Sequence, residues 1–195
     1  MMGADSAEQT EQDLEREIVV WRELWGQHVL SLLGTVLLNP TPEKYLPRST
    51  LSDYHSNGDL KKYISLSKPD ARAKLELLCG VAAGVSHIHQ QGIVHGDLKD
   101  VNVLVDDEGR PMICDFGSAY ITHCETPPCI AGPPDAFDSI VTQRYLSPEV
   151  HLTCATSQES DIWALGCILL EESMLSQAWR SRLNPLSGTN RAWPV

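Results

Sequence analysis

Two short polar segments, HGDLKDVN at residues 95–102 and DFG at residues 115–117, constrain the fold more than any other feature of this chain. The first follows a stretch with apolar residues at helical spacing, about residues 69–91, which predicts a long helix closed by a glycine. Its predicted apolar stripe consists of Leu75, Leu78, Val81 or Ala82, Val85 and Ile88. Apolar runs at residues 101–105 and 112–114 flank the turn sequence DDEG and predict a hairpin. A helix, a loop and a hairpin in this order bring the two polar segments to one edge of the domain.

The N-terminal part predicts two further helices. Residues 1–13 are polar and acidic, which predicts a flexible segment, and helical spacing of apolar residues begins at Leu14. A proline-rich, loop-like stretch follows. Either Asp59 or Ser56 is then expected to cap a short helix that continues to Ile64.

The C-terminal part begins with a long segment that has no periodicity, residues 117–147. A loop of this length inside a compact domain is usually functional or disordered. An apolar helix over about residues 160–174 follows, and it is predicted to be buried nearly all round. We therefore predict a flexible segment at 1–13, a partial domain at 14–174 that divides between residues 55 and 56, and an irregular tail at 175–195.

Composition excludes several functions. The chain has 195 residues, a formal net charge of −11 and no run of Lys or Arg, so nucleic-acid binding is not expected. Its apolar runs are shorter than the ~20 residues that a membrane-spanning helix needs, and no secretory leader pattern opens it. The six cysteines form no CxxC pair, which argues against a zinc site and favours a reducing, cytoplasmic setting. Cys79, Cys114 and Cys167 lie in apolar stretches and are predicted to be small core residues.

The two polar segments contain the residue types that phosphoryl transfer requires. A carboxylate must orient the attacking hydroxyl, hard oxygen ligands must hold Mg²⁺ on the phosphates, and a cation must offset the developing charge. Asp97, Lys99, Asn102 and Asp115 supply these groups. His95 is expected to support the loop. Three other acids are expected to be solvated or turn-forming: Asp100, Asp106 and Asp107.

With these motifs the sequence resembles the eukaryotic protein kinases: the first segment is similar to their catalytic loop and the second to their metal-binding DFG. The resemblance implies ATP and Mg²⁺ as cofactors and a protein as substrate. It makes Asp97 the catalytic base and places Lys99 on the transferred phosphate. It makes Asn102 and Asp115 the metal ligands.

Further matches extend the resemblance over about residues 14–174. SPE at 147–149 is similar to the APE that closes the activation segment, and Thr142 falls at the Thr that often contacts the catalytic Asp. Asp161, in DIWALG, resembles the Asp that anchors the catalytic-loop backbone. Glu17 resembles the helix Glu of the Lys–Glu ion pair that serves the nucleotide, the alternative being an exposed helix acid.

The resemblance also indicates a class. Lys99 is typical of serine/threonine or tyrosine-kinase-like enzymes, whereas protein tyrosine kinases usually have Ala or Arg there. A small-molecule kinase is a weaker alternative, because those enzymes commonly follow HGDL with His. Gly96 stands where an Arg normally pairs with a phosphorylated activation loop, so phosphate-driven ordering of residues 117–147 is not expected, although Ser139 and Thr142 are available.

Two departures from the family pattern limit what the motifs imply. No G-x-G-x-x-G loop precedes Glu17, and residues 1–16 contain no Lys to pair with it. The usual Arg partner of Glu149 is also missing, so Glu149 is expected to be exposed or to pair with Arg180 or Arg182. We predict an α+β, protein-kinase-like fold with an incomplete small lobe and a mostly helical, C-terminally truncated large lobe. Two functions follow: an ATP-dependent protein Ser/Thr kinase, or an inactive pseudokinase fragment that acts as a binding module.

Overall fold

The computed structural model describes residues 4–37, 48–122 and 143–173, with side chains from residue 11 to residue 172. Predictions about Ser139, Thr142 and the tail after residue 174 lie outside the described residues. The helices are α1 (Ala4–Glu23), α2 (Leu60–Ser67), α3 (Ala71–Gln90), the 3-10 turn η1 (Asp100–Asn102), α5 (Pro148–Thr153) and α6 (Gln158–Ser173). The strands are β1 (Leu32–Val36), β2 (Ser49–Ser52), β3 (Ile93–Val94), β4 (Val103–Val105), β5 (Pro111–Ile113) and β6 (Tyr120–Ile121).

The strands form three separate antiparallel pairs, β1–β2, β3–β6 and β4–β5. The predicted hairpin is therefore confirmed as β4–β5. Its first strand is shorter than predicted, because η1 occupies residues 100–102. The backbone N–H of Asn102 donates to the carbonyl of Lys99, which closes the turn before the strand begins.

The helix ends follow local signals in the sequence. Asp59, one of the two predicted caps, accepts from the backbone N–H of Lys62 at the start of α2. Asp70 does the same for α3 through the N–H of Ala73. Gly92 has φ +70° directly after α3, which is the left-handed stop that the glycine predicts. Helix α1 begins at Ala4, ahead of the predicted Leu14; the flexibility of residues 1–13 stays a prediction.

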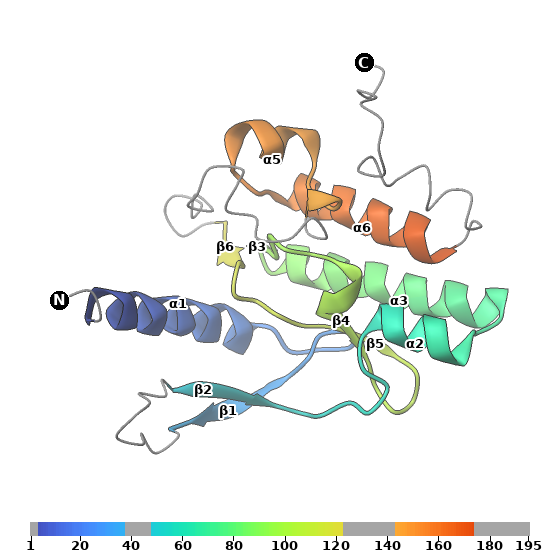
Figure 1. Cartoon of the computed structure of the whole chain (residues 1–195), viewed down its shortest axis with the longest axis horizontal. Coiled ribbons are helices and arrows are strands. Elements are labelled where there is room, and N and C mark those ends of the chain that lie inside the picture. The colour runs from blue at the N-terminus through green and yellow to red at the C-terminus, as the bar shows by residue number, and fades with distance from the viewer. Residues whose placement is uncertain (1–3, 38–47, 123–142, 174–195) are drawn as a thin grey trace.

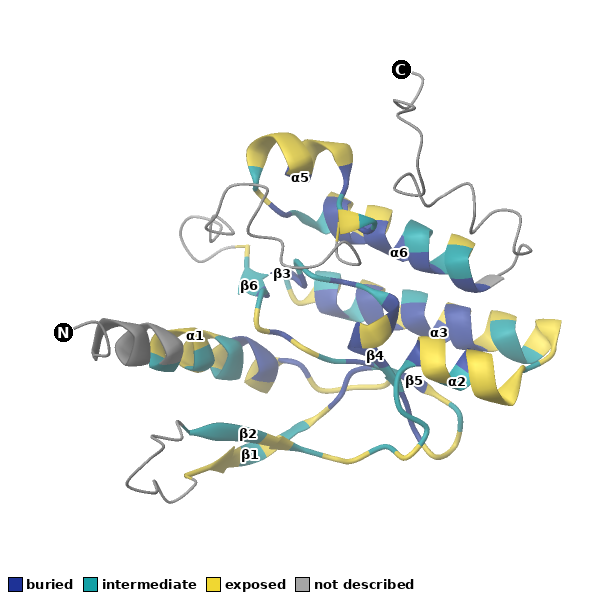
Figure 2. Ribbon diagram, viewed as in Figure 1, coloured by how far each residue is buried: buried dark blue, intermediate teal, exposed yellow. Residues whose placement is uncertain are grey.

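Helix α3 is the centre of the core, packed between α6 and strand β5 (Figures 1 and 2). The predicted stripe is confirmed at Leu78, Val81, Val85 and Ile88. It is wrong at Leu75, which is 61% exposed, because the buried face of α3 begins two to three residues later, at Leu77 and Leu78.

A glycine in the middle of α3 makes the packing against β5 possible. A Cβ atom on Gly84 would lie 2.7 Å from the carbonyl oxygen of His28 and 2.8 Å from Cδ1 of Ile113. Glycine costs about 1 kcal/mol in a helix interior relative to alanine. Here that cost is offset by the close approach of the helix to the strand.

Two burial predictions are wrong. Helix α6 is not buried all round: Ile162, Trp163 and Leu170 are about half exposed, because only one face of the helix packs against α3. Cys79 is exposed on the outer face of α3 and is not a core residue, whereas Cys114 and Cys167 are partly buried. None of the described helices has the length and apolar character needed to cross a membrane.

Candidate active site

A single buried carboxylate holds the predicted catalytic loop in place. Asp161, at the start of α6, accepts the backbone N–H of His95 at 2.8 Å and that of Gly96 at 3.0 Å. Its Oδ2 also lies 2.9 Å from Nε2 of His89 on α3. The predicted anchoring role of Asp161 is therefore seen in the geometry, across more than sixty positions of sequence.

His95 supports the loop from inside, as predicted. Its side chain is buried, and Nε2 lies 3.1 Å from the carbonyl oxygen of Cys114. The imidazole ring packs on Phe116, with 5.4 Å between the ring centroids. Because Cys114 directly precedes Asp115, this contact holds the two polar segments against each other.

Two of the predicted functional side chains, those of Lys99 and Asn102, converge on Asp97. The Nζ atom of Lys99 donates to Oδ2 of Asp97 at 2.6 Å. The amide nitrogen of Asn102 donates to the backbone carbonyl of Asp97 at 2.8 Å and reaches Oδ2 at 3.3 Å. The carboxylate of Asp97 is thus oriented by two donors from its own loop while it keeps access to solvent.

Asp115 lies beside this group at the exit of the β4–β5 hairpin. The N–H of Cys114 donates to the carbonyl of Asn102 at 3.0 Å, which places the next residue close to the loop. Asp115 has φ +68°, a left-handed conformation that costs a non-glycine residue roughly 1 kcal/mol or more. Its side chain is exposed, whereas Phe116 is fully buried between Trp21 and His95.

Helix α1 brings Glu17 toward the same place. Trp21, one turn further along, packs against Phe116 at 5.7 Å between centroids and donates its Nε1–H to the carbonyl of Leu30 at 2.6 Å. Partial burial, and then the negative charge of Asp115, raise the pKa of Glu17 above its ordinary value. No Lys or Arg of the described residues forms an ion pair with Glu17.

The oxygen atoms at this edge fit a hard divalent cation. Because the amide nitrogen of Asn102 is bound to Asp97, its Oδ1 is the atom left to face a ligand. Asp115 offers an exposed carboxylate, and hard cations prefer carboxylate and amide oxygens. The nucleotide role expected of Glu17 is supported less completely, because Glu17 has no cationic partner in the described part of the chain.

The expectation for Asp100 is wrong. Its side chain is fully buried, and Oδ2 lies 3.1 Å from Nζ of Lys61 on α2 in an ion pair without hydrogen-bond geometry. Asp106 is also buried, but it is turn-forming as predicted, since it accepts the N–H groups of Glu108 and Arg110. Asp107 is exposed.

A second network, which sequence reasoning missed, joins the residues before α5 to α6. Arg144 lies 3.2 Å from Oε1 of Glu171, and the hydroxyl of Tyr145 donates to Oε2 of Glu171 at 2.7 Å. Burial, followed by the charges of Asp100 and Glu171, holds the pKa of Tyr145 well above its ordinary value. The partners are too far apart in sequence for spacing to predict this network.

Glu149 is exposed, which is one of the two alternatives predicted for it. Its candidate partners in the other alternative, Arg180 and Arg182, lie outside the described residues.

The backbone explains why a glycine precedes Asp97. Gly96 has φ +78°, and a Cβ atom there would lie only 2.8 Å from the carbonyl oxygen of Ser118. Any other residue at this position would have to adopt a strained conformation and displace the segment after DFG. The segment after DFG therefore occupies the space next to Gly96 in which the side chain of the usual Arg would begin.

Comparisons with known proteins agree with these features. The family model for the protein kinase domain matches residues 2–185. The chain is 43% identical over 94 residues to serine/threonine-protein kinase PKH3 of Eremothecium gossypii, covering 48% of this chain and 13% of that protein. It is 32% identical over 158 residues to a probable cell division protein kinase of Encephalitozoon cuniculi, covering 80% and 53%. It is also 28% identical over 197 residues to cysteine-rich receptor-like protein kinase 19 of Arabidopsis thaliana, covering 95% and 29%.

The helix–loop–hairpin edge and its anchored loop thus define a protein kinase domain, and the chain belongs to the protein kinase family. The predicted α+β, protein-kinase-like fold is confirmed. The chain spans about half, or less, of the length of these relatives.

Proposed function

We propose that the chain transfers the γ-phosphoryl group of ATP to a Ser or Thr hydroxyl of a protein. The observation that carries this proposal is the convergence of Lys99 and Asn102 on the carboxylate of Asp97, next to Asp115. The serine/threonine kinase name of one relative supports the choice of acceptor.

Asp97 is the proposed catalytic base. Its carboxylate is partly exposed and oriented by two donors, so it is able to accept a proton from a substrate hydroxyl within hydrogen-bond reach. Lys99 would leave its ion pair with Asp97 to contact the transferred phosphate, where a cation offsets charge that develops in the transition state.

Asn102 and Asp115 are the proposed ligands for Mg²⁺, which when bound neutralises phosphate charge. Oδ1 of Asn102 and the Asp115 carboxylate are the atoms available for this role. Glu17 lies on the nucleotide side of the site. Because the charge of Asp115 is among the causes of its raised pKa, a cation held by Asp115 would lower the pKa of Glu17.

A non-catalytic binding module is the second candidate, and one observation favours it. Glu17 has no cationic partner among the described residues, and removal of a positioned cation from a phosphoryl-transfer site costs orders of magnitude in rate. In this reading the anchored loop serves only as a rigid part of a protein-binding surface.

Two measurements on the full chain separate the candidates. The first is Mg²⁺-dependent transfer of labelled phosphate from ATP to a general protein substrate, for the wild type and for Asp97→Asn. A kinase predicts a loss of about 10²–10⁴-fold in Asp97→Asn. Equal signals from both proteins would overturn the catalytic role of Asp97.

The second measurement is a thermal shift with Mg·ATP, which reports binding independently of transfer. Stabilisation of both proteins by Mg·ATP, with transfer only by the wild type, supports the kinase. Absence of both transfer and nucleotide stabilisation in the wild type would favour the binding module.

The compartment and partners are part of the proposal. The described cysteines, Cys79, Cys114, Cys154 and Cys167, are all free, which suits a reducing cytoplasm. We propose ATP and a protein substrate as partners. The expectation of no nucleic-acid binding stays a prediction.

A further inference from the structure

The C-terminal end of the catalytic loop carries an ion pair to which the proposed reaction assigns no role. Asp100 lies in η1, between Lys99 and Asn102, and its side chain is fully buried. Nζ of Lys61 on α2 lies 3.1 Å from Oδ2 of Asp100. Helix α2 packs against η1 and β4, so this pair joins a helix to the loop at a packed contact.

The turn that contains Asp100 sets the direction of two donors. The backbone N–H of Asn102 donates to the carbonyl of Lys99 at 3.0 Å, which closes residues 99–102 into one turn. From the two ends of this turn, Lys99 and Asn102 reach Oδ2 of Asp97 at 2.6 and 3.3 Å. A shift of the turn would therefore move both donors relative to the carboxylate that they orient.

Asp100 lies among other acids, which makes a cation beside it important. One carboxylate oxygen from each of Asp100, Glu171 and Glu172 lies within 4.8 Å of the other two. Carboxylates at this separation repel one another, and burial strengthens the repulsion because less water screens the charges. Arg144 forms an ion pair with Glu171. Lys61 is the cation that pairs with Asp100 in the described structure.

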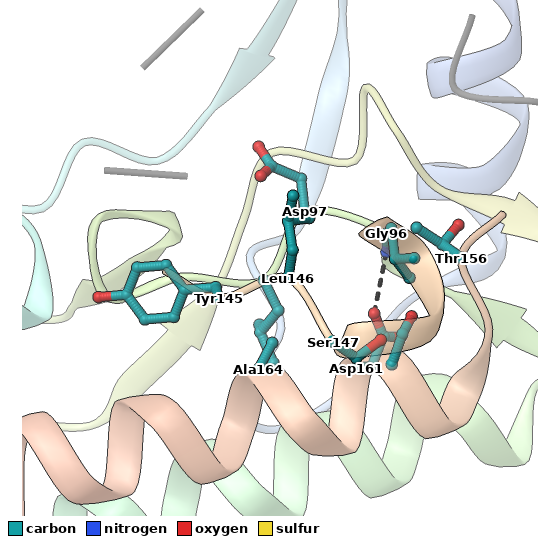
Figure 3. Close-up of a pocket in the computed structure, with 11 residues that line it drawn as sticks. Gly96, Asp97, Tyr145, Leu146, Ser147, Thr156, Asp161 and Ala164 are labelled. Carbon is teal, nitrogen blue, oxygen red and sulfur yellow. Dashed lines mark hydrogen bonds between the residues drawn. The ribbon is translucent and has the colours of Figure 1, made fainter. Parts of the chain in front are cut away.

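The loop is supported at two separate places (Figure 3). Asp161 lies below Gly96 and accepts its backbone N–H. The hydroxyl of Tyr145, which donates to Glu171, points away from Asp161 in the same view. Because Glu171 is one of the acids beside Asp100, the surroundings of Asp100 are distinct from those of the Asp161 anchor. The anchor at the start of the loop therefore leaves the turn at its end to a different support.

We infer that Lys61 is a positioning residue, whose ammonium group holds Asp100 and thereby fixes the turn over residues 99–102. The side chain of Lys61 is 46% exposed, so its stem runs along the surface of α2 and only its charged end reaches the buried carboxylate. This role rests on the proposed function where it concerns transfer, whereas the effect of the pair on the loop geometry is measurable without transfer.

An NMR comparison of full-length variants tests the positioning. Lys61→Met keeps the length of the side chain and removes its charge, and Lys61→Arg keeps the charge. Lys62→Met, at an exposed lysine one position along the same helix, is the matched control. The readout is the pair of side-chain amide signals of Asn102, because this group donates to Asp97 in the described geometry.

We expect these amide signals to shift in Lys61→Met and to keep their wild-type positions in Lys61→Arg and Lys62→Met. Unchanged signals in Lys61→Met would overturn the inference. So would an equal shift in Lys62→Met, because the effect would then belong to the helix surface in general.

A double-mutant cycle with Asp100→Asn tests whether Lys61 acts through Asp100. In urea unfolding, Lys61→Met should raise the unfolding equilibrium constant of the wild type by roughly 10–100-fold, because a buried carboxylate loses its cation. In the Asp100→Asn background the same change should raise this constant by less than about twofold. Equal effects in the two backgrounds, or no effect in either, would contradict the coupling.

A transfer assay separates this inference from the proposed function. In a wild type that transfers phosphate, Lys61→Met should lower kcat by roughly 10–100-fold, with a smaller change in KM, because a displaced turn affects the reaction more than binding. Lys61→Arg should recover most of the loss, and an unchanged kcat in Lys61→Met would contradict the positioning role. A wild type without transfer would overturn the proposed function, whereas the amide signals and the unfolding cycle would still support or overturn the role of Lys61.

Discussion

The catalytic-loop side and the α1–hairpin side of this molecule are held in very different ways. The loop is fixed by a buried carboxylate, an internal histidine and a core helix, and its anchors come from distant parts of the sequence. No buried carboxylate of this kind ties helix α1 to the β1–β2 hairpin in the described structure, and these elements and the residues directly after them expose large apolar side chains: Val19, Trp25, Leu33, Val36, Leu37 and Leu51 (Figure 2).

The difference shows which of the proposed functional side chains are held firmly in place. A sheet of only two strands has little stability unless it packs against other elements, as β4–β5 does through the contact of β5 with α3. On the α1 side, Trp21 and Leu24 carry most of the burial near the site, and Glu17 meets another carboxylate where a cation would be expected. The groups proposed for base and metal roles are therefore rigidly placed, while the side proposed to face the nucleotide is loosely supported.

The largest expected effect comes from removing the anchor of the loop. Asp161→Ala leaves the N–H groups of His95 and Gly96 buried without an acceptor. Breaking a buried ionic network costs roughly 3–5 kcal/mol. We expect the free energy of unfolding, measured with urea, to fall by an amount near the upper end of that range. Asp53→Ala, at an exposed acid, is the control and should stay within about 0.5 kcal/mol. A similar small change in Asp161→Ala would show that the loop is held by other contacts.

The second prediction compares a buried side chain beside the catalytic loop with an exposed apolar side chain of the β1–β2 hairpin. Phe116→Ala removes a fully buried ring between Trp21 and His95 and should cost near the lower end of the roughly 3–5 kcal/mol known for such changes. Leu51→Ala, on the exposed face of β2, should cost less than about 0.5 kcal/mol. Equal losses in denaturant unfolding would contradict the contrast between the two sides.

The third prediction concerns the charge on the loosely supported side. Because the pKa of Glu17 is raised in the folded state, that state binds the proton more tightly than the unfolded chain does. The carboxylate therefore lowers stability above its folded pKa, and this penalty disappears as the pH falls below the ordinary value of 4.5.

Glu17→Gln should accordingly raise Tm at pH 7 by roughly 1–2 °C, and the gain should vanish near pH 4. Glu23→Gln, at the exposed end of the same helix, serves as the matched control. A lower Tm for Glu17→Gln at pH 7 would indicate that Glu17 has a stabilising partner.

The smallest effect is a difference in thiol reactivity. Burial, and then the charge of Asp115, raise the pKa of the Cys114 thiol to about 12, whereas Cys79 is exposed on α3. Because the thiolate is the reactive species, iodoacetamide at pH 8 should modify Cys114 at least roughly 100-fold more slowly than Cys79, read by peptide mass spectrometry. Denaturant should remove the difference, and equal rates in the native protein would contradict the burial of Cys114.

Sequence reasoning predicted the part of the fold that rests on short-range signals. The caps at Asp59 and Gly92, the long helix and the β4–β5 hairpin all depend on residues within a few positions of each other. The role of Asp161 was reached through family resemblance. The placement of Asp97, Lys99, Asn102 and Asp115 agrees with their predicted proximity, while their chemical roles stay predictions.

The errors share a physical cause. Leu75, Cys79 and the outer face of α6 lie in apolar runs, and the sequence does not show which side of a helix meets a partner. The ion pair between Lys61 and Asp100 joins two elements that are not neighbours in sequence, so no local pattern reveals it. Such pairings depend on how elements pack, which the spacing of residues within one element does not determine.

The anchoring of the loop by Asp161 also sets the order in which the site is completed during synthesis. The backbone N–H of His95 and the carboxylate that receives it are separated by 66 positions. At the usual rate of roughly 5–20 residues per second, a ribosome needs about 3–13 s to add that much chain. During this interval the loop, the hairpin and α3 are made but have no α6 to hold them. The emerging chain therefore has a period in which it cannot yet hold the loop in its final geometry.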